Sequence, residues 1–345
     1  MKRTAESTAG TPGGRIPPLP AMATAVAVAA CLLSAGAAPA GARSPSPTEV
    51  AAAADGSCTT SPANSFWRAP VDELPEHPNS DRYVSSIGAA EPLHPDFGSG
   101  LVDGQPVGIP ITVSDTKLPE SKVTLDYAEE SDRSGYRIPR NARIENGPAS
   151  DGDRHVIVWD RALCRSYELW NAKPRAANAW HAGSGAVFDL RSNALRPEGW
   201  TSADAAGLAV LPGLVRYDEA AAGRIDHAIR MTVPRSDRSY VWPARHQAGA
   251  AADGSLPPMG LRLRLKGSVD TSKMGPQAKA VAEALKTYGA IVADNGSAWF
   301  ITGEEHAGWN NSQLDALKDL KGSDFEAVDA SGLRQSPDSG AVAPE

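Results

Sequence analysis

The sequence predicts a mainly β fold, a single antiparallel β-sandwich of jelly-roll type with a few peripheral helices. Short segments that are rich in β-branched residues, or that alternate between apolar and polar residues, recur along the chain. The helical patterns are few and cluster late, without the strand–helix alternation that is typical of a parallel sheet. The 32 glycines and 28 prolines supply the turns that many short strands require.

Two strand pairs and two helices carry this prediction. Residues 154–160 and 165–170 are β-type runs joined by a short connection, which predicts a hairpin, and Asn295-Gly296 predicts a second hairpin between residues 290–293 and 297–302. We predict further strands at 123–127, 186–190, 225–233 and 261–266, and helices at 276–288 and 312–321. In the strand at 261–266 the leucines alternate with basic residues, which we place on a solvated face.

The N-terminal residues predict export. Lys2 and Arg3 open a basic N-terminal region ahead of the apolar, Ala-rich segment 21–38, and small residues follow up to Ala42, where we place the cleavage of a signal peptide (1–42). A lipobox-like sequence that ends at Cys31 is the alternative, and it would leave the protein lipid-anchored.

The remaining chain divides by composition into three parts. We expect a flexible segment at 43–57, a single β-sandwich domain at 58–330 and a disordered tail at 331–345, because both flanking segments are rich in Ser, Pro and Ala. Cleavage leaves Cys58 and Cys164, which we expect to form a disulfide in an oxidising compartment.

The charge balance excludes several classes of partner. The net charge is −7, and it becomes −9 without residues 1–42, which hold three basic residues and one acidic residue. Nucleic-acid binding needs clustered positive charge, so we expect no nucleic-acid partner. No apolar run after the leader is long enough to span a bilayer, so we expect a secreted monomer without a membrane span.

The chain contains the segments 152–156 (GDRHV), 184–190 (SGAVFDL), 199–208 (GWTSADAAGL) and 224–228 (RIDHA). These four segments resemble a family of exported bacterial β-rich proteins that is common in actinobacteria. The resemblance implies one recurring exported domain, and it implies no activity and no catalytic residues.

Standard catalytic motifs are missing, so the candidate catalytic residues come from polar clusters. The sequence has no nucleophile elbow, phosphate-binding loop, His-Glu-x-x-His or Cys-x-x-Cys motif. Glu130 and Asp132 follow a predicted strand, and Asp153 and His155 begin another. Crowded carboxylates shift one another's pKa, and glycoside hydrolysis needs two of them, so we predict acid–base roles for these four residues. A solvated turn and a half-buried histidine are the structural alternatives.

Three further residues are candidate substrate contacts. Trp180 and Trp200 lie in loop-like sequence, where an aromatic ring offers a platform for a sugar ring, or else anchors the loop. Arg230 could join the basic stripe of residues 262–266 to hold an anionic polysaccharide. We expect no cofactor; the alternative is a divalent metal held by four residues. These are His94, Asp96, His155 and His246.

Together these features predict an exported carbohydrate-active protein, a polysaccharide hydrolase or lyase that uses carboxylate and histidine acid–base chemistry. The principal alternative is a non-catalytic module that binds a glycan or the cell wall. A structural or interaction protein of the cell surface is the third hypothesis.

Overall fold

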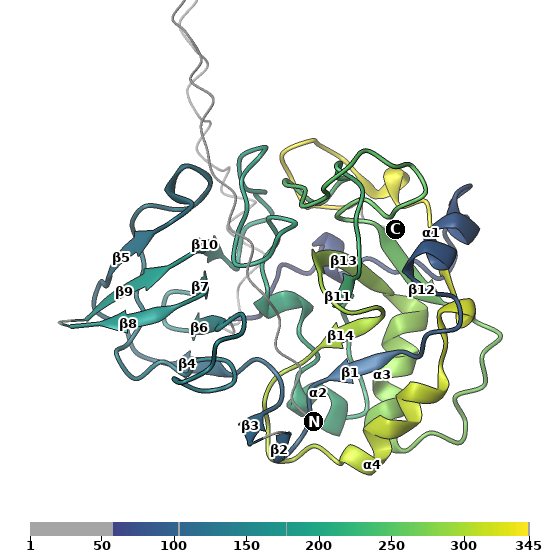
Figure 1. Ribbon diagram of the computed structural model, residues 1–345, viewed down its shortest axis with the longest axis horizontal. Helices are drawn as coiled ribbons and strands as arrows, with labels where there is room; N and C mark the ends of the chain where they lie inside the picture. Colours follow the sequence, from purple (N-terminus) through teal and green to yellow (C-terminus); the bar gives the residue numbers. More distant parts are fainter. Residues whose placement is uncertain (1–57, 103, 177, 344–345) are drawn as a thin grey trace, which may run out of the picture. The chain divides into compact units, whose positions relative to one another are not determined.

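The computed structural model describes residues 58–102, 104–176 and 178–343, all of which belong to one compact unit of the chain. More of these residues lie in strands than in helices, which confirms the mainly β prediction. The strands form a six-stranded sheet, a four-stranded sheet and two smaller sheets (Figure 1). The predicted signal peptide, Cys31 and the segment 43–57 lie outside the described residues.

The six-stranded sheet contains the larger hydrophobic core. In spatial order its strands are β1 (His94–Asp96), β14 (Phe300–Thr302), β11 (Ile229–Val233), β13 (Ala290–Asn295), β12 (Arg262–Leu265) and β15 (Phe325–Ala327). Helix α3 (Pro276–Thr287) packs its buried alanines, Val281 and Leu285 against this sheet. The helix begins at a proline and is followed by Gly289 with a φ of +67°, as the sequence predicts.

The four-stranded sheet contains the predicted hairpin. Its order is β10 (Ser184–Asp189), β7 (Arg165–Trp170), β6 (Val156–Asp160) and β4 (Ile111–Ser114). Strands β6 and β7 are antiparallel with Val156 opposite Leu169 and Asp160 opposite Arg165, which confirms the hairpin. The smaller sheets are β5 (Lys122–Leu125), β9 (Ala179–Ala182) and β8 (Lys173–Arg175), and β2 (Leu101–Val102) with β3 (Gln105–Pro106).

The pairing of the strands is mixed, unlike the predicted antiparallel sandwich. Four pairs are parallel: β1 with β14, β11 with β13, β4 with β6, and β5 with β9. The predicted hairpin at Asn295-Gly296 is also wrong, because β11 lies between β13 and β14 and pairs with both. These pairings do not confirm a jelly-roll arrangement.

The basic residues of β12 are not on a solvated face. This strand lies between β13 and β15, and Arg262 is buried, where it donates to the carbonyl oxygens of Tyr288 and Phe66. Burial lowers the pKa of Arg262 to about 9. Arg264 donates to three carbonyl oxygens of residues 71–74 and pairs with Glu326. The alternation predicted that these guanidinium groups face solvent, but backbone carbonyl oxygens accept their hydrogen bonds instead.

The remaining helices are short. They are α1 (Ser80–Ile87), α2 (Tyr217–Ala221) and α4 (Asn311–Leu314), with 3-10 turns η1 (Phe66–Arg68), η2 (Ala128–Glu130), η3 (Leu211–Gly213), η4 (Asp315–Asp319), η5 (Gly322–Asp324) and η6 (Ser331–Leu333). The helix predicted at 312–321 is thus divided into α4 and η4. Its N-cap is Asn310, whose side chain accepts from the Gln313 N–H at 3.1 Å.

A disulfide joins Cys58 to Cys164, as predicted. At the other end of the chain, residues 331–343 depart from the expected disordered tail: Ala341 bridges to Ser65, Ser339 bridges to Ala194, and Val342 is buried. Backbone pairing therefore holds a segment whose composition is typical of a flexible terminus. Among the described residues, no helix is long and apolar enough to cross a membrane.

Candidate functional site

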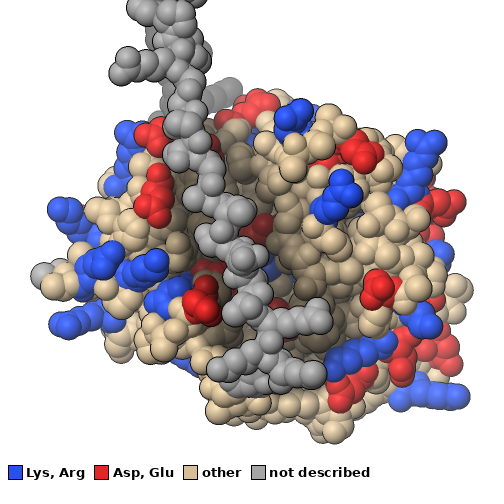
Figure 2. Space-filling model, in the orientation of Figure 1, with Lys and Arg blue, Asp and Glu red and all other residues tan. Residues whose placement is uncertain are grey.

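A cavity of about 350 Å³ brings four acidic side chains together, those of Glu130, Asp153, Asp204 and Asp294. Strand ends of both large sheets and two loops line it, and Figure 2 shows acidic side chains in the hollow of this face. The charged and aromatic lining residues are Tyr127, Glu130, Asp153, Trp170, Asp204, His246 and Asp294.

A buried ion pair forms the base of the cavity. Arg230 on β11 donates from Nε and Nη2 to the two carboxylate oxygens of Asp204, both at 2.7 Å, and from Nη1 to Thr302 Oγ1 at 2.6 Å. The loop that holds Asp204 is fixed by Ser202, whose Oγ accepts from the Asp204 N–H and donates to the Leu208 carbonyl. A bidentate pair with satisfied donors is the arrangement in which buried charges are tolerated.

Asp294 lies beside this pair and still reaches solvent. It is on β13, next to β11; its Oδ2 is 3.8 Å from Arg230 Nη2, and its side chain is 27% exposed. Burial and the charge of Asp204 raise the pKa of Asp294 to about 7, although Arg230 and a 2.7 Å hydrogen bond from the Asn295 N–H oppose this. The pKa of Asp294 therefore lies near neutrality, which suits a general acid.

Asp153 supplies an exposed carboxylate in the same cavity. It precedes β6, and the indole Nε1 of Trp170, at the end of β7, donates to its Oδ1 at 3.1 Å. The Asn171 N–H also donates to the Asp153 carbonyl, so the hairpin pairing continues up to the site. The Tyr127 ring lies 6.4 Å from the Trp170 ring, which places two aromatic side chains at the cavity.

Glu130 and His246 form a second polar pair. His246 Nδ1 donates to the Ala205 carbonyl at 2.8 Å, and Nε2 lies 3.6 Å from Glu130 Oε2. The ring is thus oriented by the backbone, and its other nitrogen is directed at a carboxylate.

His155, the predicted acid–base residue, lies in the wall behind the cavity. Its Nδ1 is 2.7 Å from Glu145 Oε2 and its Nε2 is 3.1 Å from the Ala203 carbonyl, so both nitrogens donate. Burial opposes the charged ring, but Glu145 dominates and raises the pKa of His155 to about 9, while the His155 charge lowers the pKa of Glu145. His155 is a buried, charged structural residue, and it does not line the cavity.

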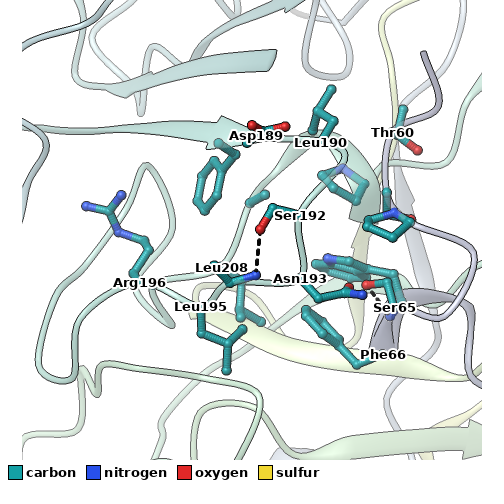
Figure 3. Close-up of a pocket in the computed structure, with 18 of the residues that line it drawn as sticks. Thr60, Ser65, Phe66, Asp189, Leu190, Ser192, Asn193, Leu195, Arg196 and Leu208 are labelled. Carbon is teal, nitrogen blue, oxygen red and sulfur yellow. Dashed lines mark hydrogen bonds between the residues drawn. The ribbon is translucent and has the colours of Figure 1, made fainter. Parts of the chain in front are cut away.

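Asp132 is separated from the other predicted carboxylates. It lines a different cavity of about 300 Å³, whose walls include Phe66, Leu195 and Leu208 (Figure 3). Its Oδ2 accepts from Arg196 Nη1 at 2.5 Å and from the Val187 N–H at 3.0 Å. These contacts hold the carboxylate in a structural role.

The predicted substrate contacts are also placed elsewhere. Trp180 is in β9 and is only 2% exposed, so it belongs to a hydrophobic core and not to a loop. Trp200 is half-buried, and the Arg196 guanidinium lies over its ring at 5.4 Å. Arg230 is buried and paired with Asp204, which leaves it unavailable to an anionic polysaccharide.

The alternative metal site is not assembled. His94 stacks on Phe300 at 3.9 Å, His155 is paired with Glu145, and His246 faces Glu130. Across the described ranges, no three His, Cys, Asp or Glu side chains are placed to hold a metal ion together.

Asp204 and Asp294, the two most informative carboxylates, carry no local sequence pattern that predicts a site. Asp204 follows Thr201 by three residues, as in a helix cap, and Asp294 precedes Asn295-Gly296, as in a turn, so both have sufficient local explanations. Tyr127 and Trp170 were assigned to strands. The single available signal was the acidic residue at the end of an apolar strand, Asp294 after residues 290–293.

Comparison with protein-family models, with curated proteins and with solved structures found no match for this chain.

Proposed function

We propose that the protein is an exported glycoside hydrolase that acts on a polysaccharide. The observation that carries this proposal is the pairing, in one cavity, of a carboxyl group that is protonated near neutral pH with carboxylates that reach solvent. Asp294 has the raised pKa, and Asp153 and Glu130 are the solvent-reaching groups. Two carboxyl groups in different protonation states are what cleavage of a glycosidic bond requires.

The chemistry assigns one role to each carboxyl group. Asp294 donates its proton to the glycosidic oxygen as the bond from that oxygen to the anomeric carbon breaks. Asp153 either removes a proton from a water molecule that attacks the anomeric carbon, or attacks that carbon itself to form an ester that water then hydrolyses. The stereochemistry of the released sugar distinguishes the two routes. Trp170 positions Asp153, and the Trp170 and Tyr127 rings contact the apolar face of a sugar.

Hydrolysis fits this cavity better than the lyase reaction. A lyase removes a proton next to a sugar carboxylate, and it needs a free cation to neutralise that carboxylate. The guanidinium at the base of the cavity, that of Arg230, is already bonded to Asp204 and Thr302. The carboxylates around the cavity would repel a substrate acid group.

The disulfide supports the proposal of export. The Cys58–Cys164 bond persists in an oxidising compartment and is rarely kept in the cytosol.

Reducing-sugar release across plant, fungal and bacterial polysaccharides tests the proposal. Asp294→Asn keeps the size of the side chain and removes the transferable proton, so we expect turnover to fall by about 10²–10⁴-fold. Asp319→Asn, on the exposed surface of η4, is the matched control and should leave turnover unchanged. Full activity of the Asp294→Asn variant would show that Asp294 is not the general acid.

The second candidate is a non-catalytic glycan-binding module, which the two aromatic rings at the cavity favour. It predicts polysaccharide retention with no release of reducing ends. It also predicts that Trp170→Ala weakens binding by about 1–3 kcal/mol while Asp294→Asn has little effect. Catalysis predicts instead that Asp294→Asn lowers turnover strongly and that Trp170→Ala lowers it less.

A further inference from the structure

The small three-stranded sheet has one side packed on a hydrophobic core and one side turned to solvent. Its strands lie in the order β5, β9 and β8, and the core side holds Val123, Leu125, Trp180 and Ala182. Because side chains alternate along a strand, the intervening residues share the opposite side, the outer face. The outer face consists of Lys122, Thr124, Ala179, His181, Lys173 and Arg175, none of which is buried.

The strand register places basic side chains close together on the outer face. Two rows cross the sheet, Lys122–Ala179–Arg175 and Thr124–His181–Lys173. Thr124 Oγ1 lies 3.2 Å from His181 Nδ1, as expected for neighbours on one side of the sheet. The spacing of strands puts the Cα atoms of Lys122 and Arg175 about 10 Å apart, and those of Lys173 and Arg175, two residues apart on β8, about 7 Å apart.

The positive charge of the outer face is not neutralised by its neighbours. Lys122, Lys173 and Arg175 are exposed, and no carboxylate of the described residues forms an ion pair with any of them. The nearest acidic residues in sequence, just before and just after β5, have other partners: Glu120 pairs with Arg137 at 2.9 Å, and Asp126 Oδ1 is 3.3 Å from His181 Nε2. Figure 2 shows Lys and Arg side chains gathered on the left, where Figure 1 places this sheet.

The need to protect the edges of the sheet explains part of this charge. Strands β5 and β8 are both edge strands, and lysine or proline on such a strand hinders pairing with another chain. Pro174 and one cation would protect β8. Edge protection does not account for the second cation on β8 or for the lack of acidic partners.

The chemistry of the outer face complements an extended polyanion. Cations about 7 to 10 Å apart can bind several acid groups of one polymer at once, whereas a single small anion meets one or two of them. Ala179 and Thr124 are small and lie in the same rows, which leaves room for a chain to lie across the sheet. An anionic membrane fits less well, because neither row holds a large apolar side chain that could enter it.

We propose that the outer face binds a polyuronate, a linear polysaccharide with a carboxylate on successive sugars, and thereby anchors the protein beside its substrate. The candidate site is close in sequence: β5 ends two residues before Tyr127, and β8 begins three residues after Trp170, both of which line the cavity. None of the three cations lines that cavity, so the polyuronate is an anchor and not the substrate. The choice of a polysaccharide among polyanions rests on the proposed function, and the charged face does not.

Titration with polygalacturonate at low salt tests the proposal. The triple variant Lys122→Gln/Lys173→Gln/Arg175→Gln should bind the polymer at least about tenfold more weakly than wild type does. Its log Kd should also depend less steeply on log salt concentration, because fewer counterions are released on binding. Wild type should bind galacturonate monomer at least about a hundredfold more weakly than the polymer, since the monomer engages one cation at a time.

A second triple variant, Lys273→Gln/Lys279→Gln/Arg334→Gln, is the matched control. It removes three exposed cations that lie outside the small sheet, and it has the same net charge as the first variant. It should bind polygalacturonate as wild type does, which separates the local face from the overall charge.

Lysine acetylation gives a readout on the wild-type protein that does not depend on the folding of any variant. Polygalacturonate should shield Lys122 and Lys173 from acetic anhydride and leave Lys273 and Lys279 as reactive as before. Equal reactivity of all four lysines with and without the polymer would overturn the proposal.

The other outcomes are equally decisive. Equal affinities of the two triple variants would overturn the proposal, and self-association of the first variant with normal binding would assign its cations to edge protection alone. Tighter binding of polyphosphate than of polygalacturonate would overturn the choice of ligand, and retention on phosphatidylserine vesicles without binding to the polymer would replace the polyuronate by a membrane. Loss of polygalacturonate binding with cleavage intact would reject the anchor and leave the hydrolase proposal, which Asp294→Asn tests separately.

Discussion

Asp294 combines two properties that rarely occur in one carboxyl group. Its side chain is partly open to solvent, yet burial and the adjacent Asp204 charge raise its pKa to about 7. Arg230 prevents a larger rise, because it lies 3.8 Å from Asp294 while it is bonded to Asp204. The proton on Asp294 is therefore available to a substrate and can be replaced from solvent.

The pKa of Asp294 predicts how activity depends on pH. If the acid form is needed, kcat/KM should decrease about tenfold per pH unit above pH 7. In the Asp294→Asn variant this limb should disappear together with most of the turnover. A wild-type profile that stays flat from pH 6 to pH 9 would exclude Asp294 as the acid.

The same group links stability to pH. The folded pKa is raised above its ordinary value of 3.8, so folding takes up a proton between pH 4 and about 7. The stabilising contribution of Asp294 to the free energy of unfolding is thus complete below pH 4, and it is lost as the pH rises through about 7. Denaturant unfolding of wild type and Asp294→Asn across this range should show a smaller decrease for the variant; parallel curves would contradict the assignment.

Arg230 is the residue on which the base of the site depends. Arg230→Ala leaves the Asp204 carboxylate buried without its partner, so we expect the free energy of unfolding to fall by about 3–5 kcal/mol. Arg224→Ala removes an exposed guanidinium from Asp226 and should change stability very little. Chemical denaturation measures both, and similar losses in the two variants would show that the Arg230–Asp204 pair is not special.

At the scale of elements, the pairing of strands that are adjacent in sequence was predictable. The pairing of strands that are far apart in sequence was not. The β6–β7 hairpin follows from two runs and a short connection, and it carries Asp153 and Trp170 to the site. Asn295-Gly296 gives an equally strong local signal, but β11 pairs with both neighbours of that turn. Asp294 is therefore a strand residue that lines a cavity and not a turn residue. No local pattern predicts that β11 lies between β13 and β14.

The tryptophans show the same limit. Glycine and polar residues around Trp180 suggested a loop, whereas β9 pairs with β5 and β8 and buries the ring. The rings at the cavity, Trp170 and Tyr127, lie at or just beyond strand ends, where alternation alone does not show which side chains remain accessible. Two predicted residues, Glu130 and Asp153, do line the cavity, whereas Asp204 and Asp294 could not be identified from local sequence.

Trp180→Ala tests the role of β9 as a core strand. Removing a fully buried ring should lower the free energy of unfolding by about 3–5 kcal/mol, with glycan affinity unchanged where the variant is folded. Trp200→Ala, which loses a contact with Arg196, should cost only about 0.5–2 kcal/mol. The expectation fails if Trp180→Ala weakens glycan binding at unchanged stability.

At the scale of the whole molecule, the disulfide connects the N-terminal segment of the described chain to the end of the β6–β7 connection, 106 residues away in sequence. Replacing both Cys58 and Cys164 with serine should cost about 2–5 kcal/mol of stability. Thiol titration of the denatured, unreduced protein should detect neither cysteine as a free thiol. Two free thiols would reject the bond.

The position of β11 also determines when the candidate site is completed during folding. This strand lies between β13 and β14, which follow it in sequence by more than fifty residues. Strand β1 pairs with β14, which lies near the other end of the described chain. Such long-range pairings form slowly, because the loops between them must close first. Arg230 is on β11, Asp294 is on β13 and Thr302 is on β14, so the charged base of the cavity is completed only when the last central strand docks. A chain released before residue 302 would hold every candidate catalytic carboxylate without the assembled base of the cavity.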